Sequence, residues 1–184
     1  MQRRRHLELL LKRFSPRDAR ELAYRGQMLE LLQKEQEPQS AFSRDYYNPG
    51  NFTASAFVLA PTGDALLLIY HAKLGRWLQP GGHVEAADAD ILAAALREVE
   101  EEVGVNELKE CGGGIFDLDI HVIPARGAAP EHAHYDVRFL FRAENEHCRA
   151  GSDALAARWV PFSEIHTLES DESVMRAVRK LCNR

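Results

Sequence analysis

The sequence predicts an α/β fold, with a mixed sheet sandwiched between helices and an N-terminal helical extension. Segments of strand length, either apolar or alternating in polarity, recur between residues 52 and 162. Two long segments with helical periodicity, 88–104 and 172–182, lie among and after them. Residues 1–45 carry helical patterns alone. We therefore expect a helical extension over residues 1–45 and a larger domain over residues 46–184.

The extension is expected to form a pair of helices. Five apolar side chains support a first short helix: Leu7, Leu9, Leu10, Leu11 and Phe14. Ser15 and Pro16 are typical of a helix start, so a second helix should run from Pro16 to about Lys34 and stop before Pro38. Its expected inner face carries Leu22, Leu29 and Leu32. We expect this pair to dock on the larger domain or to build a homodimer contact.

The strands are expected where turn signals bound apolar or alternating segments. They are predicted over residues 52–59, 65–71, 117–123, 132–141 and 157–162, with a short strand around Trp77. The segment 132–141 alternates in polarity. One face carries Ala133, Tyr135, Val137, Phe139 and Phe141 and should point to the core. The opposite face carries His132, His134, Asp136 and Arg138.

This polar strand face has three interpretations. It contacts a phosphate or ribose of a ligand, it holds a metal such as zinc or manganese, or it is a polar face in water. His121, on a strand expected to be adjacent, supports the first two interpretations if it points the same way. The candidate substrate-binding residues are therefore His134, Asp136, Arg138 and His121.

The most informative stretch is an acidic helix that follows Gly81 and Gly82. Asp88 or Asp90 is suited to cap its start, and Gly104 should end it. An apolar stripe is expected from Leu92, Leu96, Val99 and Val103. Glu98, Glu101 and Glu102 stand at i, i+3 and i+4, which places three carboxylates together. Because like charges repel, either a solvated acidic face or a counter-charge is expected, namely Arg97 or a divalent cation such as Mg²⁺.

This stretch resembles the Nudix box, G-x5-E-x7-R-E-U-x-E-E-x-G-U, in which U is a bulky aliphatic residue. Residues 97–105 match the second half of the pattern at every fixed position. The first half departs from the pattern. Counted from Gly82, Asp88 stands at the place of the first Glu, and one extra residue precedes Arg97. The resemblance covers roughly residues 50–184 and implies a Nudix-type sheet flanked by helices.

The resemblance also implies a function. It makes the chain a Nudix hydrolase that cleaves a diphosphate bond in a nucleoside diphosphate linked to another group, with ADP-ribose or a nucleotide sugar as the preferred type. Glu98, Glu101 and Glu102 become ligands of Mg²⁺ or Mn²⁺, with the carbonyl of Gly82 in the same shell, and Arg97 holds the carboxylates. The proton acceptor is one of these glutamates or an acid from another loop, for which Glu85 and Asp153 are candidates.

Two other functions stay open. The first is pyrophosphohydrolysis of a dinucleoside polyphosphate or a nucleoside triphosphate. The second is ligand sensing without catalysis, although such domains often lose the box carboxylates that are intact in this chain.

The composition indicates which classes of binding partner and which cellular location to expect. The net charge is −5, so the field of the whole molecule does not favour nonspecific binding to nucleic acid. Cys111, Cys148 and Cys182 lack metal-type spacing and are expected as free thiols in the cytoplasm. The apolar run behind Met1 is too short and too charged for a secretion signal or a membrane span. The expected partner is a small nucleotide.

Overall fold

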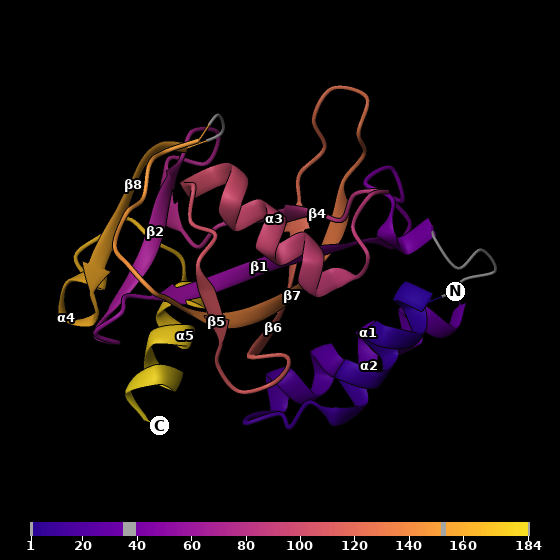
Figure 1. The fold of residues 1–184 in the computed structure, drawn as a ribbon. Coiled ribbons are helices and arrows are strands. Elements are labelled where there is room, and N and C mark those ends of the chain that lie inside the picture. Colours follow the sequence, from indigo (N-terminus) through magenta and orange to yellow (C-terminus); the bar gives the residue numbers. More distant parts are fainter. Residues whose placement is uncertain (1, 35–39, 152–153, 184) are drawn as a thin grey trace. The chain divides into compact units, whose positions relative to one another are not determined.

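The structure is a computed structural model and describes residues 2–34, 40–151 and 154–183 (Figure 1). Pro38 and Asp153 lie outside the described residues. The chain divides into two compact units. The first unit comprises residues 1–54, 82–94 and 112–139, and the second comprises residues 55–81, 95–111 and 140–184.

The helices are α1 (Gln2–Arg13), α2 (Ala19–Lys34), α3 (Ile91–Val103), α4 (Phe162–Ile165) and α5 (Glu172–Cys182), with a short 3-10 turn, η1 (Ser40–Phe42). The strands are β1 (Gly50–Leu59), β2 (Ala65–His71), β3 (Arg76–Leu78), β4 (Gly81–His83), β5 (Leu108–Glu110), β6 (Asp117–Ile123), β7 (His132–Ala143) and β8 (Ala154–Pro161). Among the described residues, the strands pair in the order β3-β2-β1-β7-β5, while β4 pairs with β1, β6 with β7 and β8 with β2. The predicted α/β class with an N-terminal pair of helices is confirmed.

In the first unit, α2 lies beside α1 and contacts β6, and β6 pairs antiparallel with β7 (Figure 1). The apolar side chains of Leu7, Leu11, Met28, Leu31 and Leu32 are buried. The described part of helix α2 reaches Lys34, the residue near which its end was predicted.

The predicted start and inner face of α2 need correction. The helix begins at Ala19 and not at Pro16, because the Asp18 carboxylate accepts a hydrogen bond from the Glu21 amide at 2.8 Å and acts as the cap. The prediction that Leu22 points inward is wrong, since its side chain is 52% exposed. Met28 and Leu31 take up the buried face instead.

In the second unit, β2 pairs antiparallel with both β3 and β8. Residues 66–69 of β2 are buried without alternation, as expected for a strand covered on both faces. Trp77 packs against the Tyr70 ring at 5.4 Å, and the Arg158 guanidinium lies 4.5 Å from the centre of its ring. The Trp159 indole donates a hydrogen bond to the Glu146 carbonyl at 2.9 Å. Helix α5 has the predicted bounds, and the Asp171 carboxylate caps it.

Helix α3 has the predicted length and caps. The Asp90 carboxylate accepts a hydrogen bond from the Ala93 amide at 2.9 Å, and Gly104, with φ +68°, ends the helix. The predicted stripe is wrong in its first half, because Leu96 is 37% exposed and Leu92 is only partly buried. The buried stripe consists of Ile91, Ala94, Ala95, Val99 and Val103. The first half of this helix therefore carries two sets of apolar side chains. The set with Ala94 and Ala95 is buried, and the set with Leu92 and Leu96 is not.

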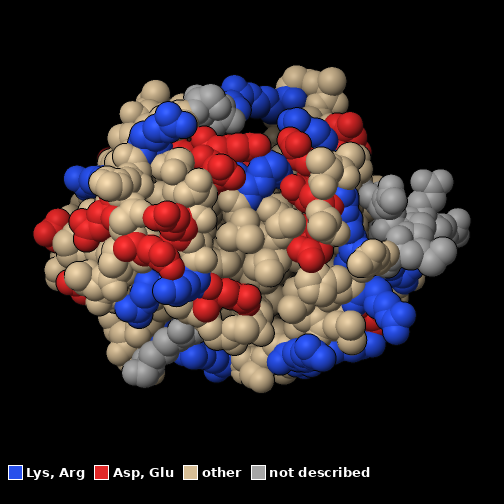
Figure 2. Space-filling model, in the orientation of Figure 1, with Lys and Arg blue, Asp and Glu red and all other residues tan. Residues whose placement is uncertain are grey.

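Two short strands, β4 and β5, were not expected, because each has three residues and β4 falls in the Gly-Gly turn signal. The start of β1 requires glycine. Gly50 has φ +149°, and a Cβ atom there would lie 1.9 Å from the Ala133 carbonyl oxygen. No helix among the described residues is long and apolar enough to cross a membrane. On the face drawn in Figure 2, Lys and Arg side chains are interspersed with Asp and Glu.

Candidate active site

Arg97 on α3 binds two of the three glutamates that the sequence singled out. Its Nη1 atom lies 2.9 Å from Glu98 Oε1 and 2.9 Å from Glu101 Oε2. The side chains of Arg97 and Glu98 are 20% and 13% exposed, whereas that of Glu101 is 57% exposed. The guanidinium thus supplies the counter-charge that two neighbouring carboxylates require.

Glu102, the third glutamate, is only 8% exposed. Its Oε2 atom accepts a hydrogen bond from the Gly81 amide at 2.9 Å, which ties the turn before the helix to the helix itself. Gly82, the expected carbonyl ligand, belongs to the first unit, whereas the three glutamates belong to the second. Its place in the metal shell stays a prediction.

The donor set of α3 fits a hard divalent cation by its chemistry. All three side chains offer carboxylate oxygens, which Mg²⁺ prefers, and those of Glu98 and Glu101 already meet at one positive charge. Within the described part of the chain, no three His, Cys, Asp or Glu side chains stand in a ready coordination cluster. The fit therefore rests on the type of the donors and on the meeting of Glu98 and Glu101 at Arg97.

Asp88, at the position where the sequence departs from the box pattern, shapes the loop before α3. It is 6% exposed, its Oδ2 atom accepts from the Glu85 amide at 2.7 Å, and its own amide donates to the Glu85 carbonyl at 3.2 Å. This aspartate closes a tight loop. The side chain of Glu85 is exposed.

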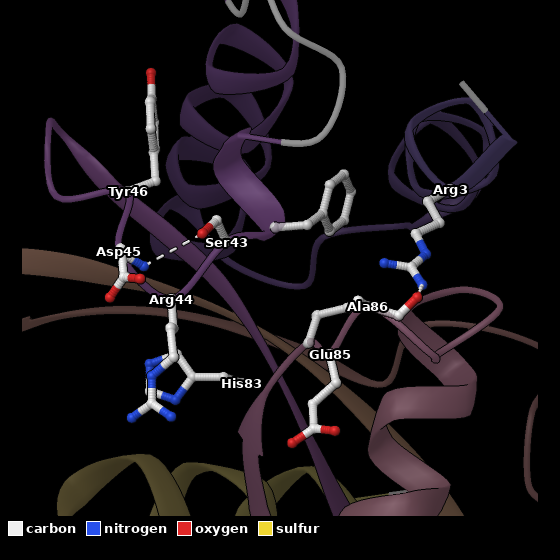
Figure 3. Close-up of a pocket in the computed structure, with 10 residues that line it drawn as sticks. Arg3, Ser43, Arg44, Asp45, Tyr46, His83, Glu85 and Ala86 are labelled. Carbon is white, nitrogen blue, oxygen red and sulfur yellow. Dashed lines mark hydrogen bonds between the residues drawn. The ribbon is translucent and has the colours of Figure 1, made fainter.

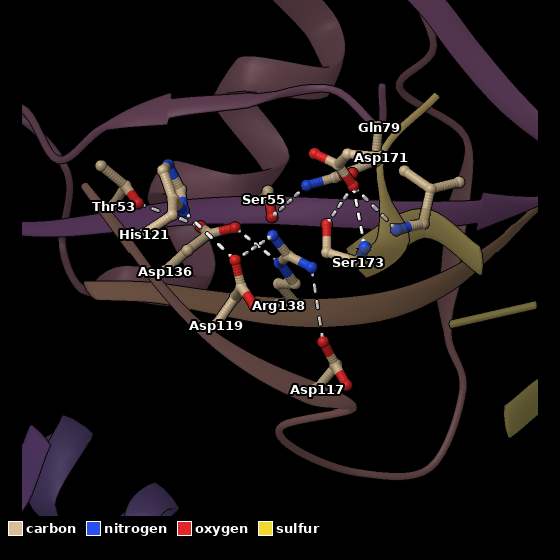
Figure 4. Close-up of polar contacts among 11 residues, drawn as sticks. Thr53, Ser55, Gln79, Asp117, Asp119, His121, Asp136, Arg138, Asp171 and Ser173 are labelled. Carbon is tan, nitrogen blue, oxygen red and sulfur yellow. Dashed lines mark hydrogen bonds and ion pairs between the residues drawn. The ribbon is translucent and has the colours of Figure 1, made fainter. Parts of the chain in front are cut away.

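The polar face of β7 contains a buried ion cluster around Arg138 (Figure 4). Its guanidinium bonds Asp136 at 2.7 Å, Asp119 at 3.2 Å and Asp117 at 3.4 Å. Burial alone lowers the pKa of Arg138, but the three carboxylates outweigh it and raise the pKa above its ordinary value. Because Asp136 and Arg138 are 4% and 2% exposed, the interpretation of a polar face in water is wrong for these two residues. Tyr135 and Val137 are buried on the other face, as predicted.

Four histidines gather beside this cluster. The ring centre of His134 lies 4.9 Å from that of His83, 5.2 Å from that of His132 and 5.5 Å from that of His121. His121 Nδ1 lies 3.2 Å from an Asp119 carboxylate oxygen, and His132 Nδ1 lies 2.8 Å from the Pro130 carbonyl oxygen. Since these oxygens accept, the Nδ1 atom of each ring is the donor in these contacts. His83 was missed as a member, because it stands in a glycine turn far away in the sequence.

The central histidine is held in its neutral form. Burial and the neighbouring His83, His121 and His132 lower the pKa of His134 to about 3, and Asp136 opposes them. Burial, followed by Arg44 and His132, lowers the pKa of His83 to about 4. The Nε2 atom of His134 is buried without a hydrogen-bond partner among the described residues. A buried polar atom of this kind is suited to contact a ligand.

Comparison with protein families shows a match to the NUDIX domain over residues 51–181. The uncharacterized Nudix hydrolase NudL of Citrobacter koseri is 41% identical over 61 residues. That stretch covers 30% of this chain and 32% of NudL, so the likeness spans about a third of the relative.

Solved structures share the fold. An Ap4A hydrolase of C. elegans in a binary complex has a TM-score of 0.58 and 17% identity, over 72% of this chain and 95% of its own. The dihydroneopterin triphosphate pyrophosphohydrolase of E. coli has a TM-score of 0.54 and 17% identity. The match covers 72% of this chain and 96% of the E. coli enzyme. The NUDIX domain of Shewanella oneidensis NrtR complexed with ADP ribose has a TM-score of 0.52 and 16% identity. The match covers 72% of this chain and 86% of the NrtR domain. At such identities the likeness shows the fold alone.

Proposed function

This chain belongs to the Nudix hydrolase family, and we propose that it uses Mg²⁺ to cleave a diphosphate bond in a nucleoside diphosphate linked to another group. ADP-ribose or a nucleotide sugar is the preferred type of substrate. The observation that carries the proposal is the arrangement on α3, where Arg97 bonds Glu98 and Glu101 while Glu102 bonds the Gly81 amide.

The residues of α3 have distinct roles in this proposal. Glu98, Glu101 and Glu102 would hold the metal, together with the carbonyl of Gly82, and Mn²⁺ is an alternative ion. A bound divalent ion supplies neutralisation of the charge on the phosphate oxygens. Arg97 orients Glu98 and Glu101 and limits their repulsion. One of the box glutamates, or Glu85, accepts the proton of the attacking water.

The polar groups of β6 and β7 support the binding of the substrate. The neutral His134 ring and the His121 ring offer imidazole nitrogens for hydrogen bonds to the substrate. Asp136 and Arg138 are too buried to be primary contacts, so their role is to hold the strand pair and, through Asp119, the ring of His121. The partner is a small nucleotide, and the three free cysteines suit a reducing cytoplasm.

A substrate panel tests the proposal. Purified protein is incubated with ADP-ribose, nucleotide sugars, dinucleoside polyphosphates and nucleoside triphosphates, each with Mg²⁺, with Mn²⁺ and with a chelator. We expect metal-dependent products from the first two groups, identified by chromatography. Faster cleavage of dinucleoside polyphosphates or nucleoside triphosphates would show that those compounds, and not ADP-ribose or nucleotide sugars, are the preferred substrates. Tight binding of a nucleotide without any cleavage would favour the ligand-sensing alternative.

A further inference from the structure

A pocket of about 680 Å³ opens beside the start of the Nudix box (Figure 3). Its described lining consists of Arg3, residues 42–46 and residues 83–86. The volume lies within the range of roughly 300–1,000 Å³ that small-molecule sites occupy. Residues 83–86 belong to the box, but Arg3 and residues 42–46 precede the region that matches the NUDIX domain. Six of the ten residues of this described lining therefore lie outside the family match.

The wall formed by residues 42–46 is fixed in position by buried contacts. Asn51 is fully buried, and its side-chain amide donates to the carbonyls of Arg44 and Tyr46, both at 3.3 Å. The ring of Phe42 lies 5.3 Å from that of Phe52, a buried residue of β1. A wall held in this way loses little conformational freedom when a ligand binds.

The opposite wall is fixed as well. The paired hydrogen bonds between Asp88 and Glu85 close the loop that follows β4. The Arg3 guanidinium donates to the Ala86 carbonyl, and His6 lies 3.1 Å from Asp90. The N-terminal helix thus bonds the same loop that lines the pocket.

The chemistry of the lining favours a nucleoside over a phosphate. The ring of His83 and the guanidinium of Arg44 are planar groups, and a nucleobase stacks on such groups. Asp45 is an exposed carboxylate, which accepts hydrogen bonds from ribose hydroxyls and base amino groups but repels phosphate. The charges of Arg3 and Arg44 are balanced by those of Asp45 and Glu85. A phosphate site would instead show an excess of positive charge.

We propose that this pocket binds the nucleoside part of the substrate and that its base stacks on Arg44. The proposal rests on the function proposed above, because it assumes a nucleotide substrate. It adds that part of the nucleoside contact lies ahead of the family region, in residues 42–46.

Binding measurements without turnover test the pocket. The probes are the four common nucleosides, their 5′-monophosphates and inorganic pyrophosphate, titrated by calorimetry into the full-length protein. Arg44→Ala and Arg44→Lys remove the plane of the guanidinium, and Lys keeps its charge. Arg20→Ala is the matched control, since Arg20 is also an exposed arginine of the extension and does not line the pocket.

We expect at least one nucleoside to bind, and both Arg44 variants to weaken it and its monophosphate by about tenfold, the size of one lost stacking contact. Pyrophosphate binding should not change, and Arg20→Ala should behave as wild type. On a cleaved substrate, Arg44→Ala should raise KM and leave kcat within a factor of about two.

Three results overturn the inference: no nucleoside binds wild-type protein, Arg44→Ala binds nucleosides normally, or it weakens pyrophosphate as much as nucleotide. The proposed function fails separately. If the protein binds nucleosides through Arg44 but cleaves no diphosphate in the panel, the pocket proposal stands and the proposed hydrolysis is refuted. If the protein cleaves ADP-ribose and the Arg44 variants bind and react as wild type, only the pocket proposal is refuted.

Discussion

The amide nitrogen of Gly151 donates to the carbonyl oxygen of Glu102 at 2.7 Å, which holds a loop against the C-terminal end of α3. The Arg149 amide donates in the same way to the Val103 carbonyl at 2.9 Å. The last carbonyls of a helix have no partner within the helix, so this loop satisfies two of them. A residue outside the Nudix box thereby supports the turn that carries Glu101 and Glu102.

Gly151→Ala is expected to lower the free energy of unfolding by about 1–3 kcal/mol, as overpacking does. A Cβ atom at this position would lie 2.1 Å from the Glu101 carbonyl oxygen, and backbone would have to move. Urea denaturation measures the change. Gly26→Ala in α2 is the control, because nothing lies within 4 Å of its Cβ position and alanine favours a helix by up to about 1 kcal/mol. Equal stability of the two variants would contradict a tight contact at Gly151.

Glu101→Gln and Glu102→Gln should each lower turnover by orders of magnitude. Each removes a carboxylate charge and nearly keeps the shape, and every ~1.4 kcal/mol of lost transition-state stabilisation costs a factor of ten. Without metal, thermal stability should stay unchanged or rise slightly, because repulsion is relieved. Glu100→Gln, an exposed glutamate of the same helix, is the control. Wild-type kcat in either variant would remove that residue from the metal site.

Deletion of residues 1–45 should cause aggregation or a change of oligomeric state. The deletion removes Met28, Leu31 and Leu32, which are buried, and uncovers apolar surface on β6, which α2 contacts. Size-exclusion chromatography with light scattering measures the outcome. A truncated protein that stays soluble with the same mass as the full chain would contradict a packing role for the extension.

His134→Ala should impair kinetics, and Tyr135→Ala should impair folding. Loss of a hydrogen bond from His134 to a charged substrate group should cost about 1–3 kcal/mol in kcat/KM. Tyr135 is 7% exposed, so its truncation should leave a cavity and cost several kcal/mol of stability, on the order of 3–5. Metal analysis accompanies the kinetics: a changed metal content in His134→Ala would favour the metal interpretation of this face, whereas normal kinetics and normal content would leave His134 without a role in either.

Acidification should destabilise the folded protein through His134. Its pKa is about 3 in the folded state, lowered by burial and by His83, His121 and His132, and is ordinary in the unfolded chain. Between about pH 6.5 and pH 3 the unfolded chain binds the extra proton, so stability is complete above this window and is lost as the pH falls. The slope contributed by one histidine is at most about 1.4 kcal/mol per pH unit. Urea midpoints at pH 7.5 and 5.0 should differ less in His134→Gln than in wild type. An unchanged difference would show that His134 is not the group involved.

The sequence predicted the elements whose ends carry local chemistry. Helix α3 starts after Asp90 because a carboxylate caps a helix, and it ends at Gly104 because glycine adopts a positive φ at no cost. Strands β2 and β6 were predicted to the residue, because turn residues flank them. Leu22 and Leu96 were misplaced, since helical spacing alone does not determine which of two apolar sets a neighbour covers.

The candidate site was predicted in part, for a related reason. The box glutamates form a contiguous motif, and helical spacing indicated Arg97 as one possible counter-charge, which pairs with Glu101 at i+4 and also with the adjacent Glu98. Periodicity placed Asp136 and Arg138 on one face of β7, but it did not show that this face is buried or that Asp117 and Asp119 join it. Residues 42–46 lie at the expected boundary between the extension and the larger domain. They line one pocket with the box loop, and the buried amide of Asn51 that holds Arg44 and Tyr46 leaves no periodic signal.

Both tryptophans of the chain, Trp77 and Trp159, belong to the second unit. Intrinsic fluorescence excited at the indole band is therefore an optical probe of that unit alone, whereas far-ultraviolet circular dichroism also records the helices of the extension. If the two signals change at the same denaturant concentration, the units unfold as one cooperative body. If the dichroism changes first, the extension and its pocket wall melt while the indoles still report a native environment.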